Sequence, residues 1–240
     1  MDKNKTHLKK LIPKFILVIK EFVKNNQFPK IRIKEDGTPV TTLDLILSQY
    51  FESQAGEFPN SVFYSEENFS EWGFPLIALD PLDGTQEYIN ENPEWAVSLA
   101  VLENDHFHGC GWVFNPMTEE SYFSPIKRHY QKKSSYRGEV SKSEWKKGLF
   151  KNKSSDEFQL KAVGSIAYKL ARLSNGQCDF VVSLQPKNIW DIAAGTVLCH
   201  EAGMKFYSQG KEVTKVEKRY EIPLIWCHEE LWPSLQKLFP

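Results

Sequence analysis

Hydrophobic positions recur at helical spacing in two segments of the N-terminal part of the chain. The first extends from about Lys5 to Asn25 and contains the run LIPKFILVIKEFV. The second contains VTTLDLILSQYFE, in which Thr41 stands at an N-cap position and Asp44 follows three residues later. These patterns predict two helices, and the cap places the start of the second at Thr41.

Further along, the apolar positions fall into short runs typical of β-strands. The run PLIAL, from Pro75, is continuously apolar and fits a buried strand, which Pro81 should end because proline cannot donate a ladder hydrogen bond. Residues 103–106 are predicted to form a hairpin turn. The other predicted strands are SVFYS from Ser61, EWAVSLAVL from Glu94, GCGWVF from Gly109 and ESYFS from Glu120.

The pattern changes twice in the C-terminal half. From Pro125 to about Glu157 the chain is basic and polar without sustained periodicity, which favours a surface connection. Helices and strands then alternate, and alternation of this kind indicates a layered α/β (α+β) fold. We predict an N-terminal α+β lobe over 1–125, a basic connection over 126–157 and a C-terminal α/β lobe over 158–240. The elements of the last lobe are a helix from Ser165 to Gly176, the strand DFVVSL, the helix IWDIAAGTVLCHEAG ended by Gly203, a strand near EIPLIW and a helix from about Glu229.

Charge and cysteine content narrow the classes of protein. The 240 residues have a formal net charge of -1, yet residues 1–34 and 126–153 each hold ten Lys or Arg against two acidic residues, so the acidic excess lies elsewhere. The four cysteines form no CxxC pair, so we expect reduced thiols and a cytoplasmic protein. Pro13 and charged residues interrupt the first helix well short of the roughly 20 apolar residues of a bilayer span, so no membrane association is expected.

The stretch ALDPLDGTQEYI, residues 78–89, carries a chemical signal. Asp80 stands at the predicted strand end, and Asp83 is placed as the N-cap of a following helix, with Gln86 at the reciprocal capping position. Such a turn can aim both carboxylates at one point while the amides of Gly84 and Thr85 face an anion. Oxygen ligands without His or Cys select Mg²⁺ or Mn²⁺, and Mg²⁺ often takes its remaining ligands from a phosphate. The alternative is that Asp83 is only a cap and Asp80 only a turn residue.

Two other acidic places extend the metal hypothesis. Glu66 and Glu67 follow a strand-like run in YSEEN, and Asp191 lies in the first turn of the helix that NIWDIAAG opens. Each also has an ordinary explanation, since paired glutamates in a loop are usually solvated and an aspartate suits a helix N-terminus. Convergence of all these acids would be costly without cations, because like charges repel.

Four segments in order resemble the motifs of the inositol monophosphatase superfamily, the lithium-sensitive Mg²⁺-dependent phosphomonoesterases. They are KEDGTPVTTLD, SEEN, LDPLDGTQEYI and NIWDIAAGTVLCHEAG, and they extend from Lys34 to Gly203. The resemblance implies the superfamily's αβαβα sandwich of two lobes. The segments DPLDGTQEYI with EWAVSLAVL, and LQPKNIWDIAAG, are more similar to the CysQ-type 3'(2'),5'-bisphosphate nucleotidases than to the inositol enzymes.

The resemblance implies a role for each matching acid. Two or three Mg²⁺ ions would be held by Glu66, Asp80, the main-chain carbonyl of Leu82, Asp83 and Asp191, with Asp80 as the bridge. Thr85 would hydrogen-bond the attacking water, and Asp44 behind it would take up or orient the proton. The alternative for Asp44 is the capping partner of Thr41. Glu67 would tune the metal site without binding directly, and Li⁺ and Ca²⁺ would inhibit.

Substrate contacts follow from the same matches. The amides of Gly84 and Thr85 would bind the phosphate, and Gly164 and Ser165, in VGSIAYKLA, match a stretch beside the bound alcohol. Ser165 has a second interpretation as the N-cap of its helix. Lys187 would meet a second phosphate, although exposed lysines are common.

The sequence therefore predicts a phosphomonoesterase that hydrolyses 3'-phosphoadenosine 5'-phosphate to AMP and phosphate, in a family whose members are often homodimers. An inositol-1-monophosphatase or related sugar phosphatase is the alternative. Aromatic residues interleaved in the basic segment 126–153 keep a non-catalytic nucleotide- or nucleic-acid-binding protein as a further alternative, although nucleic acid is not the favoured partner. The chain departs from the family pattern at Leu43, at Gly203-Met204 and in the missing Gly/Asn-Gly turn after the first lobe, so its substrate choice can differ.

Overall fold

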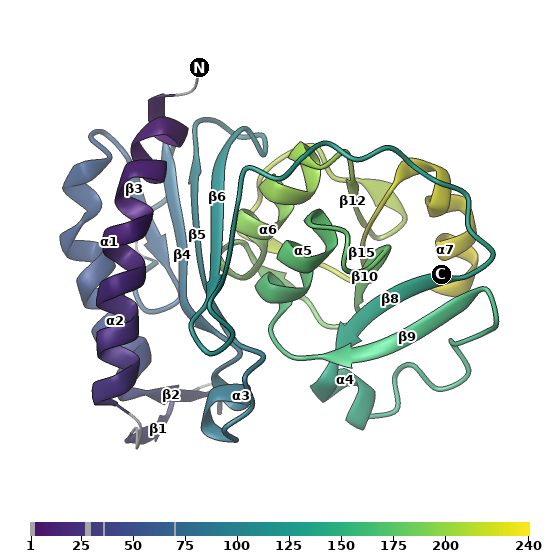
Figure 1. Cartoon of the computed structure of the whole chain (residues 1–240), viewed down its shortest axis with the longest axis horizontal. Helices are drawn as coiled ribbons and strands as arrows, with labels where there is room; N and C mark the ends of the chain where they lie inside the picture. The colour runs from purple at the N-terminus through teal and green to yellow at the C-terminus, as the bar shows by residue number, and fades with distance from the viewer. Residues whose placement is uncertain (1–2, 27–29, 36, 70) are drawn as a thin grey trace.

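The computed structural model describes residues 3–26, 30–35, 37–69 and 71–240, and these form alternating layers of helix and sheet (Figure 1). Helices α1 (Lys3–Asn25) and α2 (Thr42–Ser53) cover one face of a five-stranded sheet. Helices α5 (Ile166–Ser174) and α6 (Ile189–Glu201) lie between that sheet and a six-stranded one, whose outer face packs on α7 (Trp232–Leu238). The predicted αβαβα fold is therefore confirmed.

The first sheet has the order β3-β4-β5-β6-β7, in which only β3 and β4 are parallel. Along β5, Val97, Leu99 and Val101 pack under α1 and α2, whereas Ala96 and Ala100 join the core that includes α5 and α6. Burial on both faces explains why these strands are apolar without alternation. Their bounds are β3 (Val62–Ser65), β4 (Leu76–Asp83), β5 (Ala96–Leu102), β6 (Gly109–Asn115) and β7 (Glu120–Phe123).

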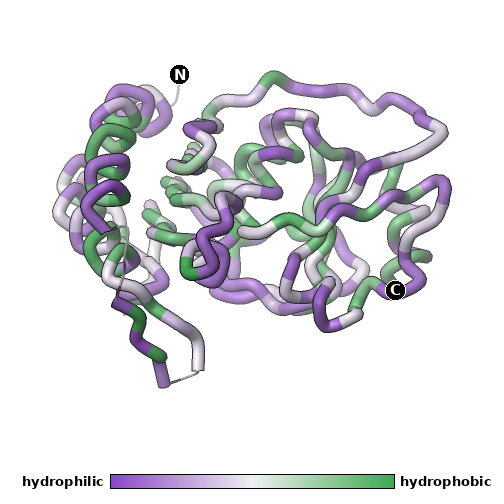
Figure 2. Tube along the Cα trace, turned by 60° about the horizontal axis from the view of Figure 1, so that its bottom comes forward, coloured by the Kyte–Doolittle hydropathy of each residue, from purple (hydrophilic) through white to green (hydrophobic). Residues whose placement is uncertain are grey.

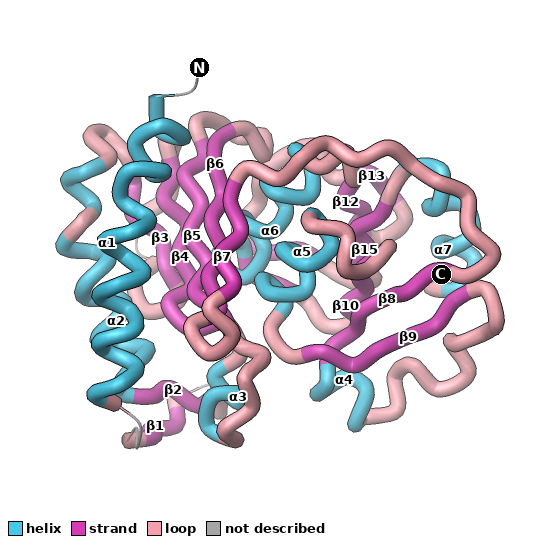
Figure 3. Tube along the Cα trace, viewed as in Figure 1, coloured by secondary structure: helices cyan, strands magenta, loops and turns pink. Residues whose placement is uncertain are grey.

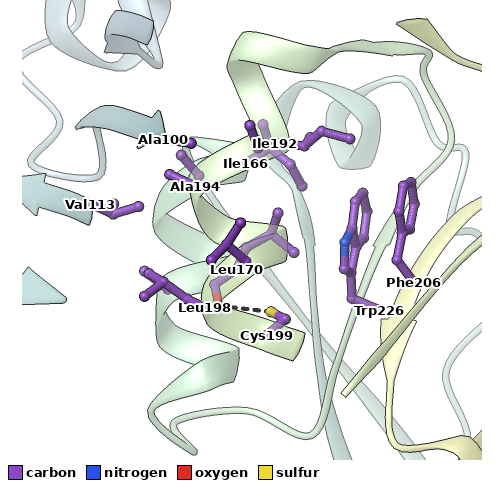
Figure 4. Packing of buried hydrophobic residues seen from close by; sticks show 14 of the residues in the cluster. Ala100, Val113, Ile166, Leu170, Ile192, Ala194, Leu198, Cys199, Phe206 and Trp226 are labelled. Atoms are coloured by element: carbon purple, nitrogen blue, oxygen red, sulfur yellow. Dashed lines mark hydrogen bonds between the residues drawn. The ribbon is translucent and has the colours of Figure 1, made fainter. Parts of the chain in front are cut away.

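The second sheet has the order β13-β12-β15-β10-β8-β9 and shares the central helices with the first sheet. Figure 4 shows Leu170 of α5 and Ala194 of α6 between Val113 of the first sheet and Trp226 of the second. The indole of Trp226 stacks on Phe206 with ring centroids 4.2 Å apart. The strands are β8 (Tyr136–Ser141), β9 (Phe158–Val163), β10 (Phe180–Ser183), β12 (Lys205–Ser208), β13 (Lys211–Glu212) and β15 (Leu224–Cys227).

The small elements complete the fold (Figure 3). Two short antiparallel pairs lie outside the main sheets, β1 with β2 and β11 with β14. Their bounds, with those of the short helices, are β1 (Ile31–Ile33), β2 (Pro39–Thr41), η1 (Ala55–Glu57), α3 (Thr85–Ile89), α4 (Lys142–Lys146), β11 (Lys187–Asn188), β14 (Arg219–Tyr220) and η2 (Glu229–Leu231).

The segment 126–157 differs from the surface connection that we expected. Its first part does run over the outside of the molecule and is largely hydrophilic (Figures 1 and 2), but it then forms β8 and α4. The sequence pattern did not predict β8 because the strand contains the charged residue Glu139. Glu139 can be buried there because it pairs with Arg172 of α5, whose Nη2 lies 2.8 Å from Glu139 Oε1. Only the folded chain provides that partner, and the division into lobes stays a prediction.

Two details at the end of β4 also correct the sequence analysis. The strand does not end at Pro81 but continues to Asp83, because the register shifts between Asp80 and Asp83 and the bulge places Pro81 where the ladder is interrupted. Helix α3 is preceded by Gly84, which has φ of 97° and takes the N-cap position predicted for Asp83. A left-handed backbone favours glycine, so the Asp83 carboxylate is released for other contacts.

Several local predictions are confirmed. Thr41 and Asp44 form the expected capping box of α2, and Ser165 caps α5 by accepting a hydrogen bond from the Tyr168 amide at 3.0 Å. All four cysteines are buried free thiols. Within the described residues, none of the helices combines the length and the apolar character that crossing a membrane requires.

Candidate active site

Glu66 and Asp80 meet because β3 and β4 are parallel neighbours that end together. The Glu66 amide donates to the Leu79 carbonyl at 3.2 Å, which places Glu66 beside Asp80. Asp80 is 2 % exposed and follows the same side of β4 as Ala78, which packs in the core around α6. Both carboxylates therefore lie where β3 and β4 end, close to α6.

Helix α6 places Asp191 near these strand ends. Ser98 pairs with Asp80 across the strands, and its hydroxyl lies 3.5 Å from the Trp190 carbonyl in the first turn of α6. The Asn188 amide donates to Asp191 Oδ2 at 2.9 Å, which fixes the side chain in a capping box. Asp191, far away in the sequence, is thereby brought next to Asp80.

The pKa values show that these carboxylates repel one another. Burial raises the pKa of Asp80 well above its usual range, and the charges of Glu66, Asp83 and Asp191 raise it further. Burial likewise raises the pKa of Asp191 to about 7, although Lys187 opposes the shift. A cluster of this kind is stable as charged groups only if cations compensate it.

Asp83 links this cluster to α5. Its Oδ2 accepts hydrogen bonds from the Ser165 hydroxyl at 2.5 Å and from the Ala167 amide at 2.6 Å. The Gly164 amide donates to Glu94 Oε2 at 2.8 Å, and a Cβ on Gly164 would lie 2.5 Å from the Glu94 carbonyl oxygen. Ser165 and Gly164, predicted to contact substrate, thus hold the start of α5 against the turn after β4.

Asp44 and Thr85 form a second pair at the N-termini of α2 and α3. The Thr85 hydroxyl lies 3.2 Å from Asp44 Oδ1 and 3.2 Å from the Leu82 carbonyl, while Asp44 Oδ2 accepts from the Thr41 amide at 2.7 Å. The capping interpretation of Asp44 is confirmed, and Asp44 also accepts a hydrogen bond from Thr85, while its catalytic role stays a prediction. Burial raises the pKa of Asp44, and the hydrogen bonds from Thr41 only partly offset that effect.

Lys34 was not identified in the sequence analysis as a site residue. Its ammonium group donates to Glu66 Oε1 at 2.8 Å and to Glu67 Oε1 at 2.7 Å. Burial lowers the pKa of Lys34, but the two glutamates together outweigh burial and raise it. Its only sequence signal was its place in KEDGTPVTTLD, and Asp36 of that motif lies outside the described residues.

The donor set fits a hard divalent cation, although the side chains are not arranged around one. Among the described residues, no group of three or more His, Cys, Asp and Glu side chains is placed to hold a metal ion. One oxygen each of Asp80, Asp83 and Asp191 is engaged within the protein, by the Leu82 amide, by α5 and by the Asn188 amide. Each carboxylate has a second oxygen, and oxygen-only ligands with mutual repulsion suit Mg²⁺.

A polar cavity of about 480 Å³ adjoins the acidic cluster at Asp83 and Gly84. It is lined by Ser165 and by the predicted Lys187, but not by Gly164. Three further lysines line it that the sequence analysis did not select: Lys142, Lys146 and Lys169. The pattern Ser141-x-x-Glu144 was a signal for the helix α4 that carries two of them.

Lys169 stabilises the wall of this cavity. It is 1 % exposed, and its Nζ donates to the carbonyls of Ser165 at 2.9 Å, Val163 at 3.1 Å and Gly164 at 3.4 Å. Burial lowers its pKa to about 8. The ammonium therefore closes the turn before α5 at an electrostatic cost.

We expect Lys169→Met to lower the free energy of unfolding at pH 7 by about 2 to 4 kcal/mol, because three buried carbonyls lose their donor. Between pH 8 and 10.5 the folded wild type binds fewer protons than the unfolded wild type, so its free energy of unfolding rises with pH. The difference in free energy of unfolding between wild type and variant should therefore grow over that range. Urea unfolding across pH measures both effects. Exposed Lys161→Met is the control, within about 0.5 kcal/mol of wild type; an equal loss in the control would contradict the assignment.

The chain is similar in sequence to known proteins. A model of the inositol monophosphatase family matches residues 5–133 and 125–231. The chain is 30% identical over 202 residues to the 3'(2'),5'-bisphosphate nucleotidase CysQ of Aggregatibacter actinomycetemcomitans, covering 72% of this chain and 73% of that protein. It is 27% identical over 188 residues to the fructose-1,6-bisphosphatase/inositol-1-monophosphatase of Thermotoga maritima, covering 72% and 73%.

Solved structures give the same fold. The Thermotoga maritima IMPase superposes with a TM-score of 0.80 at 22% identity, covering 94% of this chain and 93% of that one. An IMPase/NADP phosphatase complexed with Mg²⁺ and phosphate gives 0.77 at 16% identity, covering 98% and 96%.

The chain belongs to the inositol monophosphatase family and is a phosphoric monoester hydrolase. Within the family it is similar to the CysQ-type bisphosphate nucleotidases. An enzyme, and not the non-catalytic binding protein considered above, is therefore what the fold, the buried acids and the relatives support together.

Proposed function

We propose that the enzyme is a 3'(2'),5'-bisphosphate nucleotidase that hydrolyses 3'-phosphoadenosine 5'-phosphate to AMP and phosphate. One observation carries the proposal: the buried carboxylate cluster opens at Asp83 and Gly84 into a cavity lined by four lysines. An ester that has a phosphate at the acidic end and a second anionic group at the basic end complements this charge distribution. The similarity to CysQ supports the nucleotide.

Two or three Mg²⁺ ions would be held in this proposal by Glu66, Asp80, the Leu82 carbonyl, Asp83 and Asp191. When bound, such ions neutralise the phosphate and favour ionisation of a water nucleophile. The chain's part is to place the five oxygen donors, which come from the residue after β3, from β4 and from the first turn of α6. Glu67 and Glu66 both accept a hydrogen bond from the Lys34 ammonium group. Glu67 would thereby hold this ammonium group beside the metal ligand Glu66 without binding metal itself.

The proton of the attacking water would pass toward Thr85 and Asp44. Thr85 can accept from the water while its own hydroxyl proton points to Asp44 Oδ1, and the raised pKa of Asp44 suits a carboxylate that exchanges protons. The main-chain amides of Gly84 and Thr85, at the start of α3, would donate to the phosphate. Gly164 and Ser165 would support the leaving alcohol through the turn that they form, and Lys187 would face the second phosphate.

A sugar phosphatase is the second candidate, and one observation favours it. Ile166 is the only apolar side chain of the described residues that line the cavity, so no aromatic group is available there to stack on a base. A polar wall suits hydroxyl groups, and the Thermotoga maritima relative is named a fructose-1,6-bisphosphatase/inositol-1-monophosphatase.

Phosphate release from a matched panel distinguishes these candidates. We expect 3'-phosphoadenosine 5'-phosphate to be hydrolysed with a kcat/KM at least about tenfold above inositol 1-phosphate and fructose 1,6-bisphosphate, and EDTA to abolish turnover of all three. Preference for either sugar phosphate would replace the nucleotidase by the second candidate. Turnover that persists in EDTA would contradict the metal ligands as well.

The proposal extends to inhibitors, assembly and location. Li⁺ and Ca²⁺ should inhibit by competing for the Mg²⁺ positions. The enzyme is proposed to act in the cytoplasm, which suits four free thiols, and as a homodimer.

A further inference from the structure

We propose that Lys142 and Lys146 of α4, together with Lys187, form a subsite for a second phosphate carried by the alcohol part of the substrate. The inference rests on the proposed phosphomonoesterase site for the position of the reacting phosphate. It assigns a binding function to the segment that the sequence analysis treated as a solvated connection.

Helix α4 is held firmly against the cavity wall. Glu144 is fully buried, and its carboxylate accepts from the Ser183 hydroxyl at 2.8 Å and from the Leu184 amide at 2.8 Å. The Ser141 side chain accepts from the Glu144 amide and caps the helix. A buried carboxylate with these partners fixes α4 to the end of β10, just before Lys187 in the chain.

The anchor directs two lysines into the cavity. Lys142 and Lys146 are four residues apart, so they lie on one face of the helix, and both line the cavity that begins at Asp83. Lys142 Nζ lies 2.7 Å from Glu94 Oε2, the same oxygen that accepts from the Gly164 amide. The cationic wall is therefore tied to the turn that also contacts Asp83.

The lysines differ in how far the protein neutralises them. The ammonium group of Lys169 is occupied by three carbonyls and does not face a ligand. Among the described residues, Lys146 and Lys187 have no salt-bridge partner and Lys142 has one, while the charge of Lys187 also acts on Asp191, which lies outside the cavity lining. The lining acids are Asp83, within the catalytic cluster, and Glu87. An excess of positive charge therefore remains at the α4 end.

A phosphate group attached to the substrate is the ligand that these features fit. Lysine is a strong donor to phosphate oxygens. The seven neutral polar residues of the lining, against one apolar residue, suit a hydroxylated body between two phosphates. A volume of about 480 Å³ is within the range of small-molecule sites and leaves room beyond the phosphate at Gly84.

The test replaces the two α4 lysines and changes only the second phosphate of the ligand. For Lys142→Gln/Lys146→Gln we expect kcat/KM to fall roughly 30-fold on 3'-phosphoadenosine 5'-phosphate or fructose 1,6-bisphosphate, whichever the wild type prefers, mainly through KM. On adenosine 3'-phosphate or fructose 1-phosphate, which lack the second phosphate, the fall should be at least about fivefold smaller, and for Lys146→Gln alone, which leaves the Lys142–Glu94 ion pair in place, it should stay under about twofold. Exposed Lys147→Gln/Lys151→Gln removes the same charge from the same segment outside the cavity and should behave as wild type on both.

Equilibrium binding separates this inference from the proposed function. Adenosine 5'-phosphate and fructose 6-phosphate carry only the second phosphate, and calorimetry should show the better of the two binding about tenfold more weakly to the α4 variant than to wild type or control. Equal losses on substrates with and without the second phosphate, or unchanged affinity for both monophosphates, would overturn the subsite. Absence of wild-type turnover with a lysine-dependent binding of the monophosphate would instead count against the proposed function and retain the subsite.

Discussion

Asp80→Asn is expected to lower kcat/KM for phosphate release by about 10³-fold or more, which corresponds to roughly 4 kcal/mol of transition-state stabilisation. Asp80 stands between Glu66, Asp83 and Asp191, so the substitution removes a charge at the centre of the cluster. Asparagine keeps the shape and an acceptor for the Leu82 amide, which lies 2.9 Å from Oδ1. The variant should therefore fold, and steady-state kinetics with saturating Mg²⁺ measure the loss.

The same substitution should stabilise the metal-free protein. Removing a buried charge that its neighbours repel is expected to raise the free energy of unfolding in EDTA at pH 8 by about 1 to 3 kcal/mol. Asp179→Asn is the control, since Asp179 accepts from the Arg137 amide at 2.8 Å and pairs with Lys133, apart from the acidic cluster. Its turnover should stay within about twofold of wild type. Near wild-type turnover by folded Asp80→Asn would exclude Asp80 as a metal ligand.

The acidic half of the site was predictable because its residues lie at the ends of elements that local patterns define. The apolar run before Asp80 indicated a buried strand, and Thr41 with Asp44 indicated a helix start. An aspartate in a first helical turn is common, so the local pattern alone did not indicate that Asp191 lies near Asp80. That prediction depended on the order of the four motifs.

The basic half was not predictable in the same way because its structure depends on partners distant in sequence. Glu139 can lie in a buried strand only because Arg172 of α5 reaches it, and Glu144 can anchor α4 only because Ser183 and Leu184 receive it. The local sequence of β8 and α4 is rich in charged residues and does not indicate any of these partners. Asp83 is a similar case, since its contacts with Ser165 and Ala167 cross more than 80 residues.

The two halves bring opposite charges together at one site. The acidic cluster adjoins a cavity wall that carries Lys142, Lys146 and Lys187, and Gly84 lies on the border of the cavity. Lys34 has a related role on the other side, where it compensates Glu66 and Glu67 in the metal-free protein. An ordinary net charge of -1 for the whole chain thus conceals two opposite fields at one site.

Asp191 should make the metal-free protein less stable as pH rises through neutrality. The pKa of Asp191 is raised from 3.8 to about 7, so between these values the folded state binds more protons than the unfolded state and the free energy of unfolding falls with pH. The comparison that isolates this effect is wild type against Asp191→Asn in EDTA, because His200, whose pKa burial lowers to about 4, opposes the slope equally in both proteins. We expect the stability of wild type relative to the variant to fall by about 2 kcal/mol from pH 5 to pH 8, because the fall is confined to pH values up to the raised pKa of about 7.

Mg²⁺ should reverse this slope in wild type and not in the variant. Ions bind the ionised carboxylates, so at 100 times the dissociation constant they should add about 2.7 kcal/mol at pH 8 and much less at pH 5, where Asp191 is protonated. Urea unfolding at both pH values, with and without MgCl₂, measures the four free energies of unfolding. A MgCl₂ concentration of about 10 mM should exceed the dissociation constant of a carboxylate site. A Mg²⁺ effect of equal size at pH 5 and pH 8, or one retained in full by Asp191→Asn, would show that the ions bind elsewhere. A Mg²⁺ effect confined to high pH and lost in the variant would instead connect the raised pKa, the repulsion around Asp80 and the metal requirement through one carboxylate.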